Sequence, residues 1–134
     1  MRLNKVLMIA ACAALLGALS ISGSWAAPPA SQRPLLRHLV LYKFKDSASP
    51  AQVDEVVAAF SALPKQINSI AAFERGTNIS QEGKSQGLTH AFVVSFRDEK
   101  GRDEYLTHPA HQKYVELVRD RREQVVVFDY WASE

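Results

Sequence analysis

Cysteine is almost absent from this sequence, in which Cys12 is the only one. A single thiol cannot form a disulfide within the chain, so a disulfide scaffold is excluded and the fold has to rest on packing. Glycine is scarce as well, with six in 134 residues. No phosphate-cradling glycine loop, nucleotide fingerprint or nucleophile elbow is present, which excludes the most familiar nucleotide-binding and hydrolase motifs.

Long apolar runs are also missing, except for one near the N-terminus. Arg2 and Lys5 precede the apolar stretch Val6–Ile21, and residues 24–26 (Ser-Trp-Ala) supply a small-x-small cleavage pattern. The stretch is shorter than the ~20 residues that usually span a bilayer. The pattern therefore predicts a cleaved signal peptide over residues 1–26 and an exported protein, either periplasmic or secreted. A retained membrane anchor is the alternative.

No sign of charge dominates the rest of the chain. The sequence carries 16 basic and 14 acidic residues, and two of the basic ones belong to the predicted signal peptide, so the exported part is close to neutral. Nucleic acids and anionic membranes require a basic surface, so neither is an expected partner. After cleavage we expect an extended tether over residues 27–36, rich in proline, alanine and serine, and one domain over residues 37–134.

Hydrophobic periodicity predicts four strands and three helical stretches in this domain. Ser49 followed by Pro50 marks a helix start. In chain order we expect a strand over 38–45, a helix over 50–63, strands over 70–79 and 88–97, helical stretches over 98–105 and 109–122, and a strand over 125–131. This order predicts an α+β, ferredoxin-like βαββαβ domain with a four-stranded antiparallel sheet and the helices on one face.

The predicted sheet is apolar on both faces, although helices can cover only one of them. A small monomer rarely exposes a large apolar patch. We therefore predict a homodimer in which two copies pack sheet against sheet, through the face opposite the helices. The alternative is that the alternation is out of phase by one residue in one strand. The residues of this second face are Leu39, Leu41, Ala91, Val93, Val126, Phe128 and Tyr130.

A short segment, Tyr105–His111, combines a phenol and two of the four histidines around Pro109. In an unbroken helix Tyr105 and His111 would lie about 240° apart around the axis and could not share a pocket. Pro109 disfavours helical geometry at His108 and is suited to the first position of a new helix. A kink at this point would let Tyr105 and His111 face one cavity as an acid/base pair. The alternative is a helix junction with a purely structural role.

Several segments together resemble the stress-responsive dimeric α/β-barrel family, often abbreviated Dabb. They are Arg37–Lys45, Thr89-His90, Tyr105–His111 and Phe128–Tyr130, which follow in the family's order and at its spacing. The resemblance covers nearly the whole predicted exported chain. It implies a ferredoxin-like homodimer whose two sheets form a barrel, in agreement with the strand alternation. Family members include plant stress proteins and the plant polyketide cyclase that forms olivetolic acid.

The resemblance to the cyclase implies a pocket beneath the helices, with His111 as the base and Tyr105 as its hydrogen-bonding partner. A neutral imidazole can remove a proton next to a carbonyl near pH 7, and a phenol can donate to the developing oxyanion. Tyr42 and Val115 replace smaller residues of the cyclase, which narrows the expected cavity. The expected substrate-binding residues are His38, Val40, Tyr42, Phe60, His90, Phe92 and Tyr114.

The sequence leaves three classes of function open. The first is an exported stress-response protein that binds a small apolar or carbonyl-containing molecule without a cofactor. The second is a cyclase or lyase that uses His111 and Tyr105. The third is a non-catalytic interaction scaffold or a metal-binding module. No metal is predicted, because Pro109 places His108 outside the helix of His111 and no carboxylate or cysteine is near in the sequence. Both histidines also have a structural interpretation, His108 at the helix start and His111 in the core.

Overall fold

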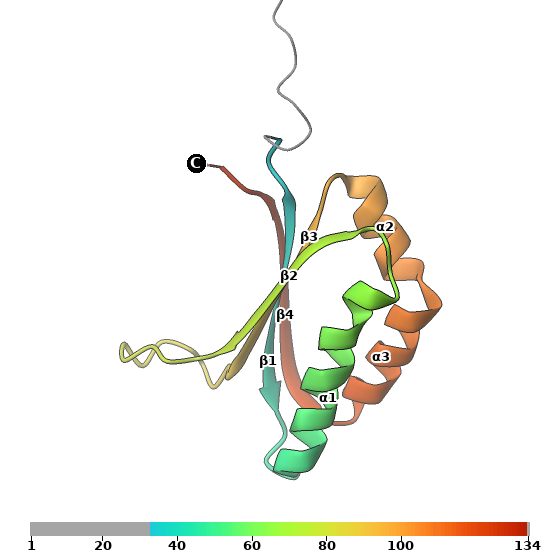
Figure 1. The fold of residues 1–134 in the computed structure, drawn as a ribbon. Helices are drawn as coiled ribbons and strands as arrows, with labels where there is room; N and C mark the ends of the chain where they lie inside the picture. The colour runs from blue at the N-terminus through green and yellow to red at the C-terminus, as the bar shows by residue number, and fades with distance from the viewer. Residues whose placement is uncertain (1–32, 134) are drawn as a thin grey trace, which may run out of the picture.

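The computed structural model describes residues 33–133 and shows the predicted order of elements (Figure 1). The predicted signal peptide and residues 27–32 of the predicted tether lie outside the described residues. The elements are β1 (Leu36–Phe44), α1 (Pro50–Ala62), the 3-10 helix η2 (Leu63–Lys65), β2 (Ile70–Thr77), β3 (His90–Phe96), α2 (Glu99–Thr107), α3 (Pro109–Arg119) and β4 (Arg122–Trp131). The ferredoxin-like α+β prediction is confirmed.

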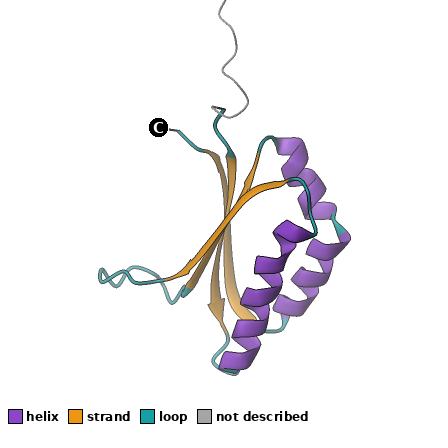
Figure 2. Cartoon of the chain, in the orientation of Figure 1, coloured by secondary structure: helices purple, strands orange, loops and turns teal. Residues whose placement is uncertain are grey.

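The strands form one antiparallel sheet in the order β2-β3-β1-β4. The first and last strands of the chain are therefore neighbours, and β2 and β4 are the two edges. The helices α1, α2 and α3 all lie on one side of the sheet, and the other side is uncovered (Figure 2). None of the helices within residues 33–133 has the length and hydropathy needed to cross a membrane.

Helix α1 begins where the serine-proline pair predicted it. The Ser49 side chain accepts a hydrogen bond from the Gln52 backbone N–H, and the Gln52 side chain accepts one from the Ser49 N–H, which completes a capping box. Pro50 occupies the first turn, where its missing N–H costs nothing. The helix buries Val56 and Phe60 against the sheet, so its start and its apolar face both follow from local sequence.

The predicted kink between the two later helices is confirmed. Asp98 caps α2 by accepting from the Gly101 N–H at 2.8 Å. At His108 the backbone is extended (φ −66°, ψ 135°), and Pro109 starts α3. The His108 Nδ1 accepts from the Ala110 N–H at 3.1 Å, so this histidine is the N-cap of α3. The break turns the chain by the mechanism that the sequence indicated.

The last strand is longer than its pattern predicts. It begins at Arg122, three residues early, because α3 already ends at Arg119. The chain turns where the Arg121 N–H donates to the Val118 carbonyl at 3.0 Å. Arg122 then pairs with Phe44, past a register shift at which β4 carries one extra residue, Glu123. A partner strand that is distant in sequence therefore decides where β4 starts.

The core lies between the helices and the inner strands and is rich in aromatic rings. Phe60 stacks on Phe92 with ring centroids 4.5 Å apart and lies 4.5 Å from the ring of Tyr114. The opposite face of the sheet keeps its apolar side chains in solvent, with Phe128 60% and Tyr130 41% exposed. In the register Leu39 pairs with Val93 and Phe128, so the strand alternation is in phase across these three strands.

Candidate functional site

Tyr105 lies in the last turns of α2 between two imidazoles. Its ring is 4.2 Å from the ring of His111 on α3 and 5.6 Å from the ring of His38 on β1, measured between centroids. Only 1% of the Tyr105 surface is exposed. The kink at Pro109 is what allows a residue of α2 and a residue of α3 to meet. We call Tyr105, His38 and His111 the phenol–imidazole cluster.

The hydrogen bond of His111 fixes which ring nitrogen carries the proton. Its Nδ1 lies 3.2 Å from the carbonyl oxygen of Leu106. A carbonyl can only accept, so Nδ1 donates and the Nε2 of the neutral ring keeps a free lone pair. Burial lowers the pKa of His111, and the nearby His38 and His108 lower it further, although the Leu106 carbonyl opposes them. The ring is thus held neutral with Nε2 available as a base.

His38 is oriented by a carboxylate that the sequence analysis assigned no role. Asp129 lies directly opposite His38 in the β1–β4 register, and its Oδ1 is 2.7 Å from the His38 Nδ1. The other oxygen of Asp129 accepts from Arg102 of α2 at 3.2 Å. The carboxylate holds Nδ1 as a donor and leaves the His38 Nε2 without a proton in the neutral ring. The Phe128-Asp129-Tyr130 motif contained this residue, but only the strand pairing shows its partner.

The Tyr105 hydroxyl is a donor held in its protonated form. Burial raises its pKa well above the ordinary value, and the neighbouring Tyr42 raises it further, with no contribution from a hydrogen bond within residues 33–133. A phenol with this environment does not ionise near neutral pH. The hydroxyl can therefore donate a hydrogen bond to an acceptor that reaches the cluster, such as a carbonyl oxygen.

His90, the fourth predicted polar group, lies apart from the cluster. On β3 it pairs with Tyr42, whereas Val94 pairs with His38. Four residues of strand separate these positions, which is roughly 13 Å. The His90 Nδ1 is 2.9 Å from the Thr89 hydroxyl, and burial followed by the charge of Arg75 lowers its pKa. The structure therefore brings three of the four groups together.

A pocket of about 290 Å³ opens beside His90, between α1 and the edge of the sheet. It is apolar at Phe92 and Val57 and charged at Asp54 and Arg75. Of the predicted substrate-binding residues, only His90 and Phe92 line it. Within residues 33–133 no three His, Cys, Asp or Glu side chains gather as a metal site would need.

The remaining predicted substrate-binding residues form packed core between these two regions. Val40, Tyr42, Phe60 and Tyr114 are all buried. The Tyr114 hydroxyl donates to the Tyr42 hydroxyl at 3.1 Å, so the two phenols satisfy each other. Aromatic rings therefore fill the middle of the space beneath the helices. The alternation that predicted pocket-lining residues on these strands predicts core residues equally well.

Comparison with known proteins decides the family. The model of the stress responsive A/B barrel domain matches residues 36–132. The chain belongs to this family. Among curated relatives, the stress-response A/B barrel domain-containing protein HS1 of Arabidopsis thaliana is 33% identical over 95 residues, covering 71% of this chain and 87% of HS1. Olivetolic acid cyclase of Cannabis sativa is 30% identical over 95 residues, covering 71% of this chain and 94% of the cyclase.

A solved structure supports the fold of this A/B barrel protein. A dimeric ferredoxin-like protein of unknown function from Thermobifida fusca superposes with a TM-score of 0.65 at 24% identity. The match covers 75% of this chain and 93% of that one. The family prediction made from the Arg37–Lys45 and Tyr105–His111 segments is confirmed, and the fold agrees with it.

Proposed function

We propose that this A/B barrel protein is an exported homodimer that binds a small carbonyl-containing molecule at the phenol–imidazole cluster. The observation that carries this proposal is the Tyr105 hydroxyl, a protonated donor between two imidazoles. The hydroxyl makes no hydrogen bond to another group within residues 33–133, so its donor is available to a ligand oxygen. His111 is the partly exposed member of the cluster, so we expect a ligand to approach from its side.

The geometry suits a ligand that carries a carbonyl group. A carbonyl oxygen can accept a hydrogen bond from the Tyr105 hydroxyl, and the free Nε2 of His111 can accept a hydrogen bond or a proton from another part of the same molecule. The surrounding core is apolar, which suits the carbon skeleton of the ligand.

Binding can be tested by titrating the isotopically labelled protein with small ketones and aldehydes and following amide shifts. Tyr105→Phe keeps the ring and removes the donor, so we expect affinity to fall about fivefold, the value of one hydrogen bond near 1 kcal/mol. Tyr130→Phe, on the opposite face, is the matched control. Equal affinity of the Tyr105→Phe variant and the wild type would contradict the proposal.

A second candidate function, acid–base turnover of the cyclase or lyase type, is favoured by the state of His111. Its free Nε2 can take a proton from the carbon next to the carbonyl, and the electron pair of that C–H bond moves to form an enolate. The negative charge then rests on the oxygen that Tyr105 holds. The 30% identity to olivetolic acid cyclase supports the same type of chemistry.

Proton abstraction can be measured without knowing the natural substrate. In D₂O the protein should catalyse exchange of the methyl protons of a simple methyl ketone, followed by proton NMR. His111→Ala should remove the exchange, and His90→Gln, outside the cluster, should retain it. If the wild type does not accelerate the exchange, the function is binding without turnover, and if His111→Ala exchanges like an active wild type, His111 is not the base.

The homodimer rests on the uncovered sheet face, where Phe128 alone is 60% exposed. The Thermobifida fusca protein of the same fold is described as dimeric, which supports this assembly. Light scattering should give twice the monomer mass, and Phe128→Glu should yield monomers. Export rests on the N-terminal sequence; N-terminal sequencing of the protein recovered outside the cytoplasm should begin at Ala27.

A further inference from the structure

We infer that the loop between β2 and β3, residues 78–89, is an arm that clasps the second copy of the chain. The inference rests on the proposed homodimer and assigns a contact that sheet-to-sheet packing does not include. In Figures 1 and 2 the loop extends on the side of the sheet opposite the helices. We call residues 78–89 the arm.

The arm has a defined shape although it lies away from the core. The Asn78 N–H donates to the Thr89 carbonyl at 2.8 Å and closes its base. The Leu88 N–H donates to the Ser85 carbonyl at 2.9 Å near its return. Gly87 has φ +81°, a left-handed backbone conformation that favours glycine at the turn back into β3. A projecting loop that is internally bonded is suited to contact another surface.

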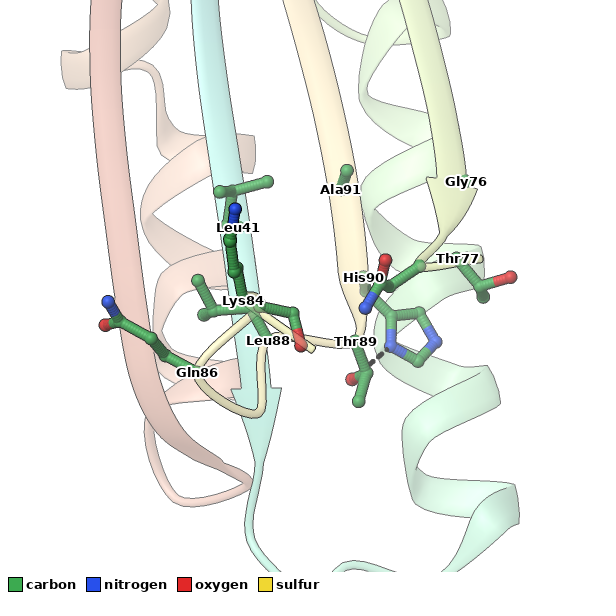
Figure 3. Close-up of a pocket in the computed structure, with 11 residues that line it drawn as sticks. Leu41, Gly76, Thr77, Lys84, Gln86, Leu88, Thr89, His90 and Ala91 are labelled. Atoms are coloured by element: carbon green, nitrogen blue, oxygen red, sulfur yellow. Dashed lines mark hydrogen bonds between the residues drawn. The ribbon is translucent and has the colours of Figure 1, made fainter. Parts of the chain in front are cut away.

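The arm and the uncovered face enclose a pocket of about 400 Å³ (Figure 3). Leu41 and Ala91 of the sheet and Leu88 of the arm give it apolar walls. Leu41 and Ala91 belong to the same apolar face that is proposed to meet the partner. The pocket is therefore continuous with the proposed interface, and the arm forms its outer wall.

The chemistry of this surface fits a second copy of the chain. Its charges are paired within the chain: Lys84 of the arm with Glu82 at 3.1 Å, and Arg37 of the face with Glu74 at 3.7 Å. Ile79 of the arm is 90% exposed, the most exposed large apolar side chain among residues 33–133. A second copy related by a two-fold axis presents the same apolar face. Because the arm projects from that face, it would extend beyond the interface and contact the surface of the partner.

The test compares two exposed apolar positions on opposite sides of the molecule. Ile79→Glu changes the arm, and Leu106→Glu changes α2, where the side chain is 37% exposed. Dimer dissociation constants are measured by analytical ultracentrifugation, with circular dichroism to show that both variants fold. We expect Ile79→Glu to weaken the dimer at least tenfold and Leu106→Glu to change it less than twofold.

Two outcomes separate the arm from the dimer itself. If Phe128→Glu yields monomers while Ile79→Glu dimerises like the wild type, the dimer stands and the clasp is wrong. A monomeric wild type overturns both. Contact is tested directly in a mixed dimer with one methyl-labelled copy, where Ile79 methyl groups should show isotope-filtered NOEs to the unlabelled copy. Their absence, or a small molecule retained in the arm pocket with unchanged dimerisation of Ile79→Glu, overturns the inference.

Discussion

The molecule buries its phenols in two different ways. Tyr42 and Tyr114 are hydrogen-bonded to each other in the middle of the core, and aromatic rings surround them. Tyr105 is just as buried, and its ring contacts Phe96 as well as the imidazoles of His38 and His111, but its hydroxyl gains no such bond within the described residues. A bonded pair of hydroxyls stabilises the fold, whereas a hydroxyl with no protein partner leaves its donor available to a ligand. The first region is therefore packed core, and the second is where we propose the binding site.

The largest expected effect comes from removing an aromatic ring beside the Tyr42–Tyr114 pair. Phe60 contacts both Phe92 and Tyr114 and is 1% exposed. Phe60→Ala should lower the free energy of unfolding by about 3–5 kcal/mol, because it loses transfer free energy and leaves a cavity. Urea unfolding measures the loss, with the exposed Leu106→Ala as control. A loss below 1 kcal/mol would mean that the region is loosely packed and open to ligands.

Most of this core was predictable, since alternation on β1 and β3 already placed Tyr42 and Phe92 on the covered face. The sequence could not show whether these aromatic residues line a ligand pocket or fill the hydrophobic core. Aromatic residues fit both roles, and the space between helix and sheet depends on packing distance rather than on pattern. The same limit explains Asp129, whose bond to His38 follows from the β1–β4 register and not from local spacing.

A smaller effect separates the two regions by their hydrogen bonds. Tyr42→Phe removes the acceptor of the Tyr114 hydroxyl and leaves that hydroxyl buried without a partner. The expected cost is about 1–3 kcal/mol of unfolding free energy, and Tyr42→Phe combined with Tyr114→Phe should cost less than the sum of the single changes. A double-mutant cycle by urea unfolding measures this. Strict additivity would contradict a shared bond.

Tyr105→Phe should affect stability still less than Tyr42→Phe. No hydrogen bond is lost within the described residues, and the ring contacts with His38 and His111 remain, so the unfolding free energy should change by less than about 0.5 kcal/mol. The same unfolding experiment serves as the measurement. A cost as large as that of Tyr42→Phe would show that the Tyr105 hydroxyl has a structural partner, and the contrast between the two phenols would fail.

The smallest expected effect is the pH dependence of stability that arises from His111 in the phenol–imidazole cluster. The folded pKa of His111 is lowered mainly by burial, whereas the unfolded chain keeps the ordinary value near 6.5. Below that pH the unfolded chain binds a proton that the folded protein resists, so the unfolding free energy falls as the pH drops and levels off below the folded pKa. His111→Gln should fall less steeply between about pH 7 and 5 in urea unfolding. The pKa of His90 is also lowered, but His90 is present in both proteins and cancels in the comparison. Equal slopes would mean that the His111 ring is open to water, and the case for a neutral base beside Tyr105 would be lost.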